Sequence, residues 1–328
     1  MRSRLQHLGR ATVVLATMLA AFVLVGCGKP SGEQPEPLTR VVTTIPALAG
    51  LVGPLLPESV SCESLLSPGQ SIHGHRMSAS QIARASSAQI IFGIGLGLEE
   101  GALEYFERTA RPTQRVLAFA TLVGIESSHA HTHAHNHNPD DPEDACIDEH
   151  GLNPHLWLDV QQCLLFVEAA GEALSEYAAD ETLARDIRAR TITMLERIRA
   201  IDAEYAAALA PHRGRAILTQ HAAFAPLLDR YGLREIAIHR TGGETSPTPG
   251  EVAAAVRTLT ENKVAAIFVE PQMSDAFARR LAADTRLPIG TLDPLGRGDW
   301  FELMRTNLAQ LVEALNRSPV PAPGEGAP

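Results

Sequence analysis

The sequence predicts an α/β protein with two lobes, each built on a parallel sheet and joined to the other by one long rigid α-helix. Short runs of β-branched and other apolar residues alternate with longer helical patterns, which is typical of parallel sheets. The alternation restarts after Pro211, and an uninterrupted helical pattern separates its two halves. With 328 residues, 45% of them apolar, the chain is long enough for two domains with their own cores.

Eight segments are predicted to form strands. Four precede the long helical pattern, at residues 40–45, 60–66, 89–94 and 116–119. Four follow it, at residues 216–219, 235–238, 264–269 and 289–292, and helical segments such as 249–261 separate them. Binding sites in parallel sheets form at the carboxyl ends of strands, so the residues that follow these segments are candidates for function.

The long helical pattern covers residues 180–210, which contain no Gly or Pro, and Pro211 follows it. Apolar side chains recur mostly three or four residues apart, and Asp180 can cap the start of the helix. A helix of ~30 residues is about 45 Å long, which is long for a connection inside one domain. We therefore predict an N-terminal lobe at 39–179 and a C-terminal lobe at 211–317, with little hinge motion between them.

The N-terminus is predicted to be a lipoprotein signal peptide, residues 1–26. Three arginines precede an apolar segment, 11–25, that is too short for a comfortable membrane span. It ends in Leu24-Val25-Gly26-Cys27, which resembles the lipobox of bacterial lipoproteins, a class in which Cys27 would be lipidated. An ordinary signal peptide or an uncleaved anchor is the alternative.

Two further segments are predicted not to fold. Residues 27–38 are predicted to be a flexible tether, and residues 318–328 are predicted to be a disordered tail.

The net charge of the chain excludes one class of function, nucleic-acid binding. The formal net charge is −10, and cleavage of the signal peptide removes three arginines and no acid, which takes the charge to −13. Such acidity argues against nucleic acid as a partner.

Three cysteines besides Cys27 are present: Cys62, Cys146 and Cys163. An exported protein can keep one disulfide, although the sequence does not identify which two cysteines would form it. Cys146 is also a candidate metal ligand.

The 13 histidines are unevenly distributed. Six of them lie in a polar segment, residues 127–150, which is predicted to be a mobile loop: His129, His131, His133, His135, His137 and His150. Imidazole suits zinc, copper and nickel, so this loop is predicted to be a weak auxiliary collector of metal ions. A solvated or pH-responsive loop without a metal role is the alternative.

Four other polar residues lie where the predicted strands should end, two in each lobe. They are His73, His155, His221 and Asp293. Three imidazoles and a carboxylate suit a four-coordinate zinc site in which the protein fills every position. Such a site leaves no position for a reacting water, so it favours capture and release of the metal over catalysis. His75 and Glu270 are further candidates near the same site.

Several motifs occur in an order and at spacings that are specific only when taken together. In the N-terminal lobe they are Pro68-Gly69 followed by His73, residues 88–92 with 95–99, and residues 153–159. In the C-terminal lobe they are residues 220–224 with 231–233, 246–249, 267–272 and 293–296. This series resembles the zinc- and manganese-type solute-binding proteins of ABC importers, over almost all of the mature chain.

The resemblance implies two Rossmann-like lobes with the metal buried in the cleft between them. It assigns the ligand role to His73, His155, His221 and Asp293. In this family a His at the third ligand position and a long His-rich loop accompany zinc, whereas Glu at that position accompanies manganese or iron.

The chain also departs from the family pattern. Ser71-Ile72 stands in place of Asp-Pro before the first His, His75 in place of an aromatic residue, and Asn153 in place of Asp.

The resemblance further implies a monomeric, non-enzymatic receptor. It would be held outside the cytoplasmic membrane by lipid on Cys27, on the periplasmic side in a diderm, and would deliver Zn²⁺ to an ABC permease and its ATPase. Manganese, iron, copper or nickel is the alternative cargo. A metal-buffering or adhesin-like lipoprotein without an importer is a second alternative. A metal-dependent hydrolase is a third, although the chain contains no H-E-x-x-H motif.

Overall fold

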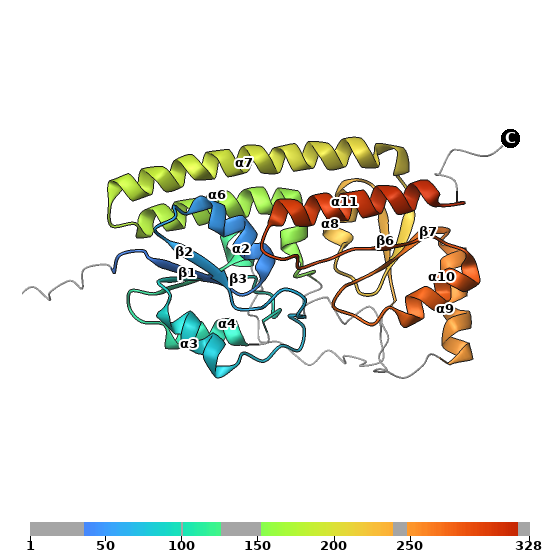
Figure 1. Ribbon diagram of the computed structural model, residues 1–328, viewed down its shortest axis with the longest axis horizontal. Coiled ribbons are helices and arrows are strands. Elements are labelled where there is room, and N and C mark those ends of the chain that lie inside the picture. The colour runs from blue at the N-terminus through green and yellow to red at the C-terminus, as the bar shows by residue number, and fades with distance from the viewer. Residues whose placement is uncertain (1–35, 100, 126–151, 239–247, 321–328) are drawn as a thin grey trace, which may run out of the picture. The chain divides into compact units, whose positions relative to one another are not determined.

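The computed structural model describes residues 36–99, 101–125, 152–238 and 248–320, all within one compact unit (Figure 1). The predicted signal peptide, Cys27, Cys146 and the six histidines of the His-rich loop lie outside the described residues. In the part of the chain that is described, no helix is long and apolar enough to cross a membrane.

The N-terminal lobe contains a four-stranded parallel sheet with the strand order β2-β1-β3-β4. Its strands are β1 (Arg40–Thr43), β2 (Ser61–Ser64), β3 (Ile90–Gly93) and β4 (Arg115–Ala118). Its helices are α2 (Pro46–Val52), α3 (Ala79–Ser87), α4 (Ala102–Thr109), α5 (Phe119–Leu122) and α6 (Val160–Tyr177), with 3-10 turns at Gly53–Leu55 and Leu156–Leu158. The central strand β3 is fully buried, which agrees with its run of apolar residues.

The C-terminal lobe repeats this arrangement with the strand order β6-β5-β7-β8, again all parallel. Its strands are β5 (Ala216–Thr219), β6 (Arg234–Ala237), β7 (Val264–Val269) and β8 (Ile289–Thr291). Its helices are α8 (Ala225–Arg230), α9 (Pro249–Glu261), α10 (Ala276–Thr285) and α11 (Trp300–Arg317), after a 3-10 turn at Ala210–His212. The predicted fold class, two parallel α/β lobes with a long helix, is confirmed.

The long helix is α7, which spans the 29 residues Glu181–Leu209 and packs along α6 and α11 (Figure 1). Asp180 caps it as predicted, because its side chain accepts a hydrogen bond from the backbone N–H of Thr182. The backbones of α6 and α7 approach closely at Gly171, where a Cβ atom would overlap the side chain of Thr191. The helix is thus fixed by packing along its length.

Regular strand pairing covers less of the chain than the apolar runs suggest. The segments 216–219, 264–269 and 249–261 form elements with the predicted bounds, whereas the strand predicted at 60–66 pairs only over Ser61–Ser64. Leu65 and Leu66 are buried, and their N–H groups still donate to backbone carbonyls of the β1 end, but they lie beyond the regular strand. Hydrophobicity reports burial and not pairing, so the predicted strand was too long.

The two lobes share one hydrophobic core. A single cluster of buried residues contains side chains from both sheets and from α6, α7 and α11. Two tryptophans bond across the junction: Trp157 Nε1 donates to the Pro294 carbonyl at 2.5 Å, and Trp300 Nε1 donates to the Trp157 carbonyl at 2.9 Å. This shared packing favours little hinge motion, which stays a prediction.

Two of the three cysteines considered for a disulfide are described, and both are free thiols. Cys62 lies on β2 and Cys163 on α6, so a bridge between these two is excluded. Burial raises the pKa of the Cys62 thiol to about 12 and also raises that of Cys163, which makes both thiols unreactive at neutral pH.

Candidate metal site

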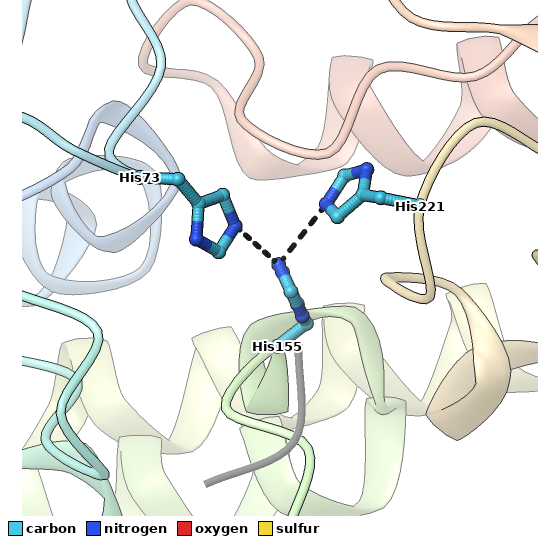
Figure 2. A group of neighbouring side chains, drawn as sticks. All are labelled: His73, His155 and His221. Atoms are coloured by element: carbon cyan, nitrogen blue, oxygen red, sulfur yellow. Dashed lines mark hydrogen bonds between the residues drawn. The ribbon is translucent and has the colours of Figure 1, made fainter. Parts of the chain in front are cut away.

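Three of the four predicted ligands meet at one point between the lobes (Figure 2). His73 lies in the loop between β2 and α3, His155 immediately precedes the turn before α6, and His221 follows β5 by two residues. One ring nitrogen from each lies within 4.8 Å of the others. The Nε2 atom of His155 lies 3.2 Å from His73 Nε2 and 3.4 Å from His221 Nε2.

These distances fit one small cation between the three rings. Two nitrogens that bind the same zinc ion at 2.0–2.1 Å, with a tetrahedral angle between them, lie about 3.3 Å apart. Nitrogen lone pairs that face each other at this distance repel unless a proton or a metal ion lies between them. The arrangement can therefore hold a divalent metal without a large rearrangement of the rings.

Burial differs among the three histidines and sets their electrostatics. His155 and His221 are buried, whereas His73 is exposed, so it forms the solvent side of the group. Burial lowers the pKa of His155 well below its usual value, and the neighbouring His221 and His73 rings lower it further. A ring that stays neutral keeps a lone pair for a metal ion.

Hydrogen bonds at the opposite ring nitrogens orient the two buried histidines. His221 Nδ1 lies 2.5 Å from Glu270 Oε1, and His155 Nδ1 lies 2.7 Å from Asn153 Oδ1. Glu270 directly follows β7, and its own backbone N–H donates to Gln220 Oε1 at 2.6 Å. Partners of this kind fix the tautomer and direct Nε2 toward the site.

Asp293, the fourth predicted ligand, does not join the group of three histidines. Its Oδ1 accepts hydrogen bonds from Gln272 Nε2 at 2.8 Å and from the Leu295 N–H at 2.9 Å. It lines a neighbouring cavity of about 320 Å³, whereas the histidines line one of about 230 Å³. Gln272, which donates to Asp293, lines both cavities.

The structure also places the two further candidates that the sequence indicated. His75 is not part of the group of three histidines, and its Nε2 lies 3.2 Å from Gln81 Oε1. Glu270 touches His221 and lines the same cavity, but it is not part of the group of three ligand atoms.

Sequence reasoning missed the place of Gln272 and of Met273 in the cavity wall. Both follow the end of β7, so the rule that sites form at the carboxyl ends of strands could have indicated them.

This chain is similar to known proteins whose names specify metal binding or uptake. The profile of the family described as zinc-uptake complex component A, periplasmic, matches residues 41–314. The iron-binding protein YfeA of Yersinia pestis is 26% identical over 284 residues, which cover 85% of this chain and 84% of YfeA. The manganese ABC transporter substrate-binding lipoprotein PsaA of Streptococcus pneumoniae is 23% identical over 323 residues, which cover 92% of this chain and 99% of PsaA.

A solved structure has the same fold. The crystal structure of a zinc-bound ZnuA deletion mutant superposes with a TM-score of 0.69 at 21% identity, covering 86% of this chain and 99% of that one. The names of these similar proteins specify zinc, manganese or iron, and they agree on metal binding. Because the family profile covers most of the chain, this protein belongs to the periplasmic zinc-uptake component A family, the zinc- and manganese-type solute-binding proteins of metal ABC transporters.

Proposed function

We propose that the protein captures Zn²⁺ outside the cytoplasmic membrane and delivers it to the permease and ATPase of an ABC importer. The proposal rests on the convergence of His73, His155 and His221, whose ligand atoms lie within 4.8 Å of one another. Three neutral imidazoles favour zinc over manganese and magnesium, which prefer oxygen ligands. In this account zinc is cargo, so the site has to bind and release it without changing it.

We further propose that Asp293 supplies the fourth ligand when the metal is bound. Its carboxylate is held by Gln272 at 2.8 Å, so it would have to exchange this hydrogen bond for the metal. A shell of three imidazoles and one carboxylate leaves no position for a reacting water, which suits transport and not hydrolysis. Asp293→Asn should therefore weaken zinc binding while leaving the three histidines in place.

Competitive titration against a zinc chelator tests the proposed ligands. We expect His155→Ala and His221→Ala each to lower zinc affinity by at least about 100-fold, because groups that merely orient a ligand already contribute about 10- to 100-fold. His75→Ala is the matched control, since this half-buried histidine contacts Gln81 and not the group of three. Equal zinc affinity in all of these variants and the wild type would refute the assignment.

Iron or manganese is the second candidate cargo, because YfeA is named for iron and PsaA for manganese. Both metals accept a carboxylate ligand, and Asp293 is close enough to the site to share Gln272 with it. Titration of the metal-free protein with Zn²⁺, Mn²⁺ and Fe²⁺ separates the candidates. The proposal requires zinc to bind at least about 100-fold more tightly than manganese. The reason is that three of the proposed ligands are imidazole nitrogens, which suit zinc, whereas manganese prefers oxygen ligands.

Two accessory features belong to the proposal. The histidines at 129–137, with His150, would bind further zinc weakly. Deletion of residues 127–150 should therefore remove the weakly bound equivalents of zinc and leave the tightly bound one.

Lipid on Cys27 would hold a monomeric receptor at the membrane, so Cys27→Ser should move the exported protein from the membrane fraction to the soluble fraction.

A further inference from the structure

The side chain of Asn153 joins the loops that carry two of the proposed ligands. Its Nδ2 donates to the backbone carbonyl of Ala222 at 2.7 Å. Its Oδ1 accepts from the backbone N–H of His155 at 3.0 Å and lies 2.7 Å from the ring Nδ1 of His155. Ala222 directly follows His221, so one amide spans from the N-terminal lobe to the C-terminal lobe.

These contacts determine which way the amide faces. The carbonyl of Ala222 can only accept a hydrogen bond, so the NH₂ group of Asn153 must face it. The amide oxygen must then face His155, and an amide oxygen can only accept. The proton of a neutral His155 ring therefore lies on Nδ1, which leaves the lone pair on Nε2, the atom that faces His73 and His221.

We infer that Asn153 is a positioning residue for the metal: it sets the tautomer of His155 and ties that ring to the loop of His221. The inference rests on the proposed function, since it matters only if these two rings bind the cargo. An aspartate at position 153 could still accept from both N–H groups of His155. It could not donate to Ala222, however, and its charge would face that carbonyl. The link between the lobes thus requires an amide and not merely an acceptor.

Two substitutions separate the two roles of the side chain. Asn153→Ala removes both the tautomer control and the link, and we expect it to lower zinc affinity by about 10- to 100-fold. Asn153→Asp keeps the acceptor, loses the link and adds a negative charge beside the Ala222 carbonyl, and we expect zinc to dissociate about 10-fold faster while the His155 tautomer is unchanged. Asn262→Asp is the matched control, because Asn262 Nδ2 donates to the Thr258 carbonyl at the end of α9, just before the start of β7, whereas Glu270 follows the other end of that strand.

The experiment combines chelator competition, stopped-flow release of zinc and NMR of the protein labelled with ¹⁵N at histidine. In the metal-free wild type we expect the His155 ring to be protonated at Nδ1, with its signals assigned by their loss in His155→Ala. Asn262→Asp should match the wild type within about twofold in affinity and release, since it leaves both ligand loops intact. The tautomer is measured on the wild type, so the inference stays testable if Asn153→Ala does not fold.

Three results would overturn the inference. The first is an Nε2-protonated His155 ring in the metal-free wild type. The second is wild-type affinity in a folded Asn153→Ala variant, and the third is wild-type release in Asn153→Asp. If His155→Ala loses tight binding while these variants do not, the proposed function stands and the role of Asn153 is wrong. If His155→Ala also binds zinc tightly, the proposed function itself fails.

Discussion

Glu235 is a half-buried carboxyl group beneath the loop that carries His221. Its Oε1 accepts hydrogen bonds from Thr219 Oγ1 at 2.6 Å and from the Phe224 N–H at 3.2 Å. Its Oε2 is buried and has no hydrogen-bond partner among the described residues. Burial raises the pKa of Glu235 to about 7, so this carboxyl becomes charged in the folded protein only near neutral pH.

This raised pKa predicts a pH-dependent effect of Glu235→Gln. The folded-state pKa lies above the ordinary value of 4.5, so the group favours folding below pH 4.5 and loses that contribution as the pH rises through about 7. We expect the substitution to increase the free energy of unfolding by about 2 kcal/mol more at pH 8 than at pH 5. Denaturant unfolding of both metal-free proteins measures this, and a difference that does not change with pH contradicts it.

The residues of the site were predictable to different degrees. Positions at strand ends and family motifs indicated His73, His155 and His221, and the structure brings these three together. The same reasoning placed Asp293 beside them, but its carboxylate is held by Gln272 and Leu295. The direction of a side chain depends on such contacts. One of them comes from Gln272, which is 21 residues away in the sequence, so spacing along the chain does not report it.

The contact between α6 and α7 depends on a glycine. Gly171 lies inside α6, where glycine is unfavourable, yet a Cβ atom there would overlap the Thr191 side chain of α7. Gly250 lies in the first turn of α9, where a Cβ atom would meet nothing closer than the Thr248 hydroxyl at 4.0 Å. The same substitution should therefore have opposite effects in the two helices.

We expect Gly171→Ala to lower the free energy of unfolding by about 1–3 kcal/mol, because the two helices must move apart. Gly250→Ala should raise it by about 0.5 kcal/mol, since alanine favours the helix and fits the space. Denaturant midpoints of the two variants, compared with the wild type, test this pair of effects. Destabilisation of equal size at both positions would mean that the helix contact is looser than the structure indicates.

Element bounds were predictable for some buried or capped segments, although the buried strand β3 covers Ile90–Gly93 and not the predicted 89–94. The buried strand β7 and the helix α9, which has a capping box at Thr248 and Glu251, have the predicted bounds. At the sheet edges, β4 and β6 each begin and end one residue before their predicted positions. Edge strands are only half covered, so their apolar pattern marks the ends less sharply.

The two lobes are similar in topology although the sequence contains no convincing internal repeat. Both sheets place the second strand at an edge and the first strand beside the third. This likeness requires only that buried and exposed positions recur in the same order, which different residues can satisfy. For the same reason the sequence predicted two α/β lobes but not their equivalence.

The shared core predicts that both lobes unfold together. Trp157 and Trp300, the only two tryptophans in the chain, lie at the junction between the lobes, so their fluorescence reports the junction, whereas far-UV circular dichroism reports the helices of both lobes. We expect the two signals of the metal-free protein to change at the same denaturant concentration. A fluorescence change that precedes the dichroism change would show that the junction opens first.

We propose that one divalent metal ion binds between the lobes at His73, His155 and His221. Anomalous diffraction at the zinc edge, from crystals of the protein loaded with one equivalent of zinc, tests it most directly. We expect one dominant peak, about 2.0–2.1 Å from the Nε2 atoms of all three histidines. A dominant peak at the histidines of residues 129–137, with the three rings between the lobes free of metal, would contradict it.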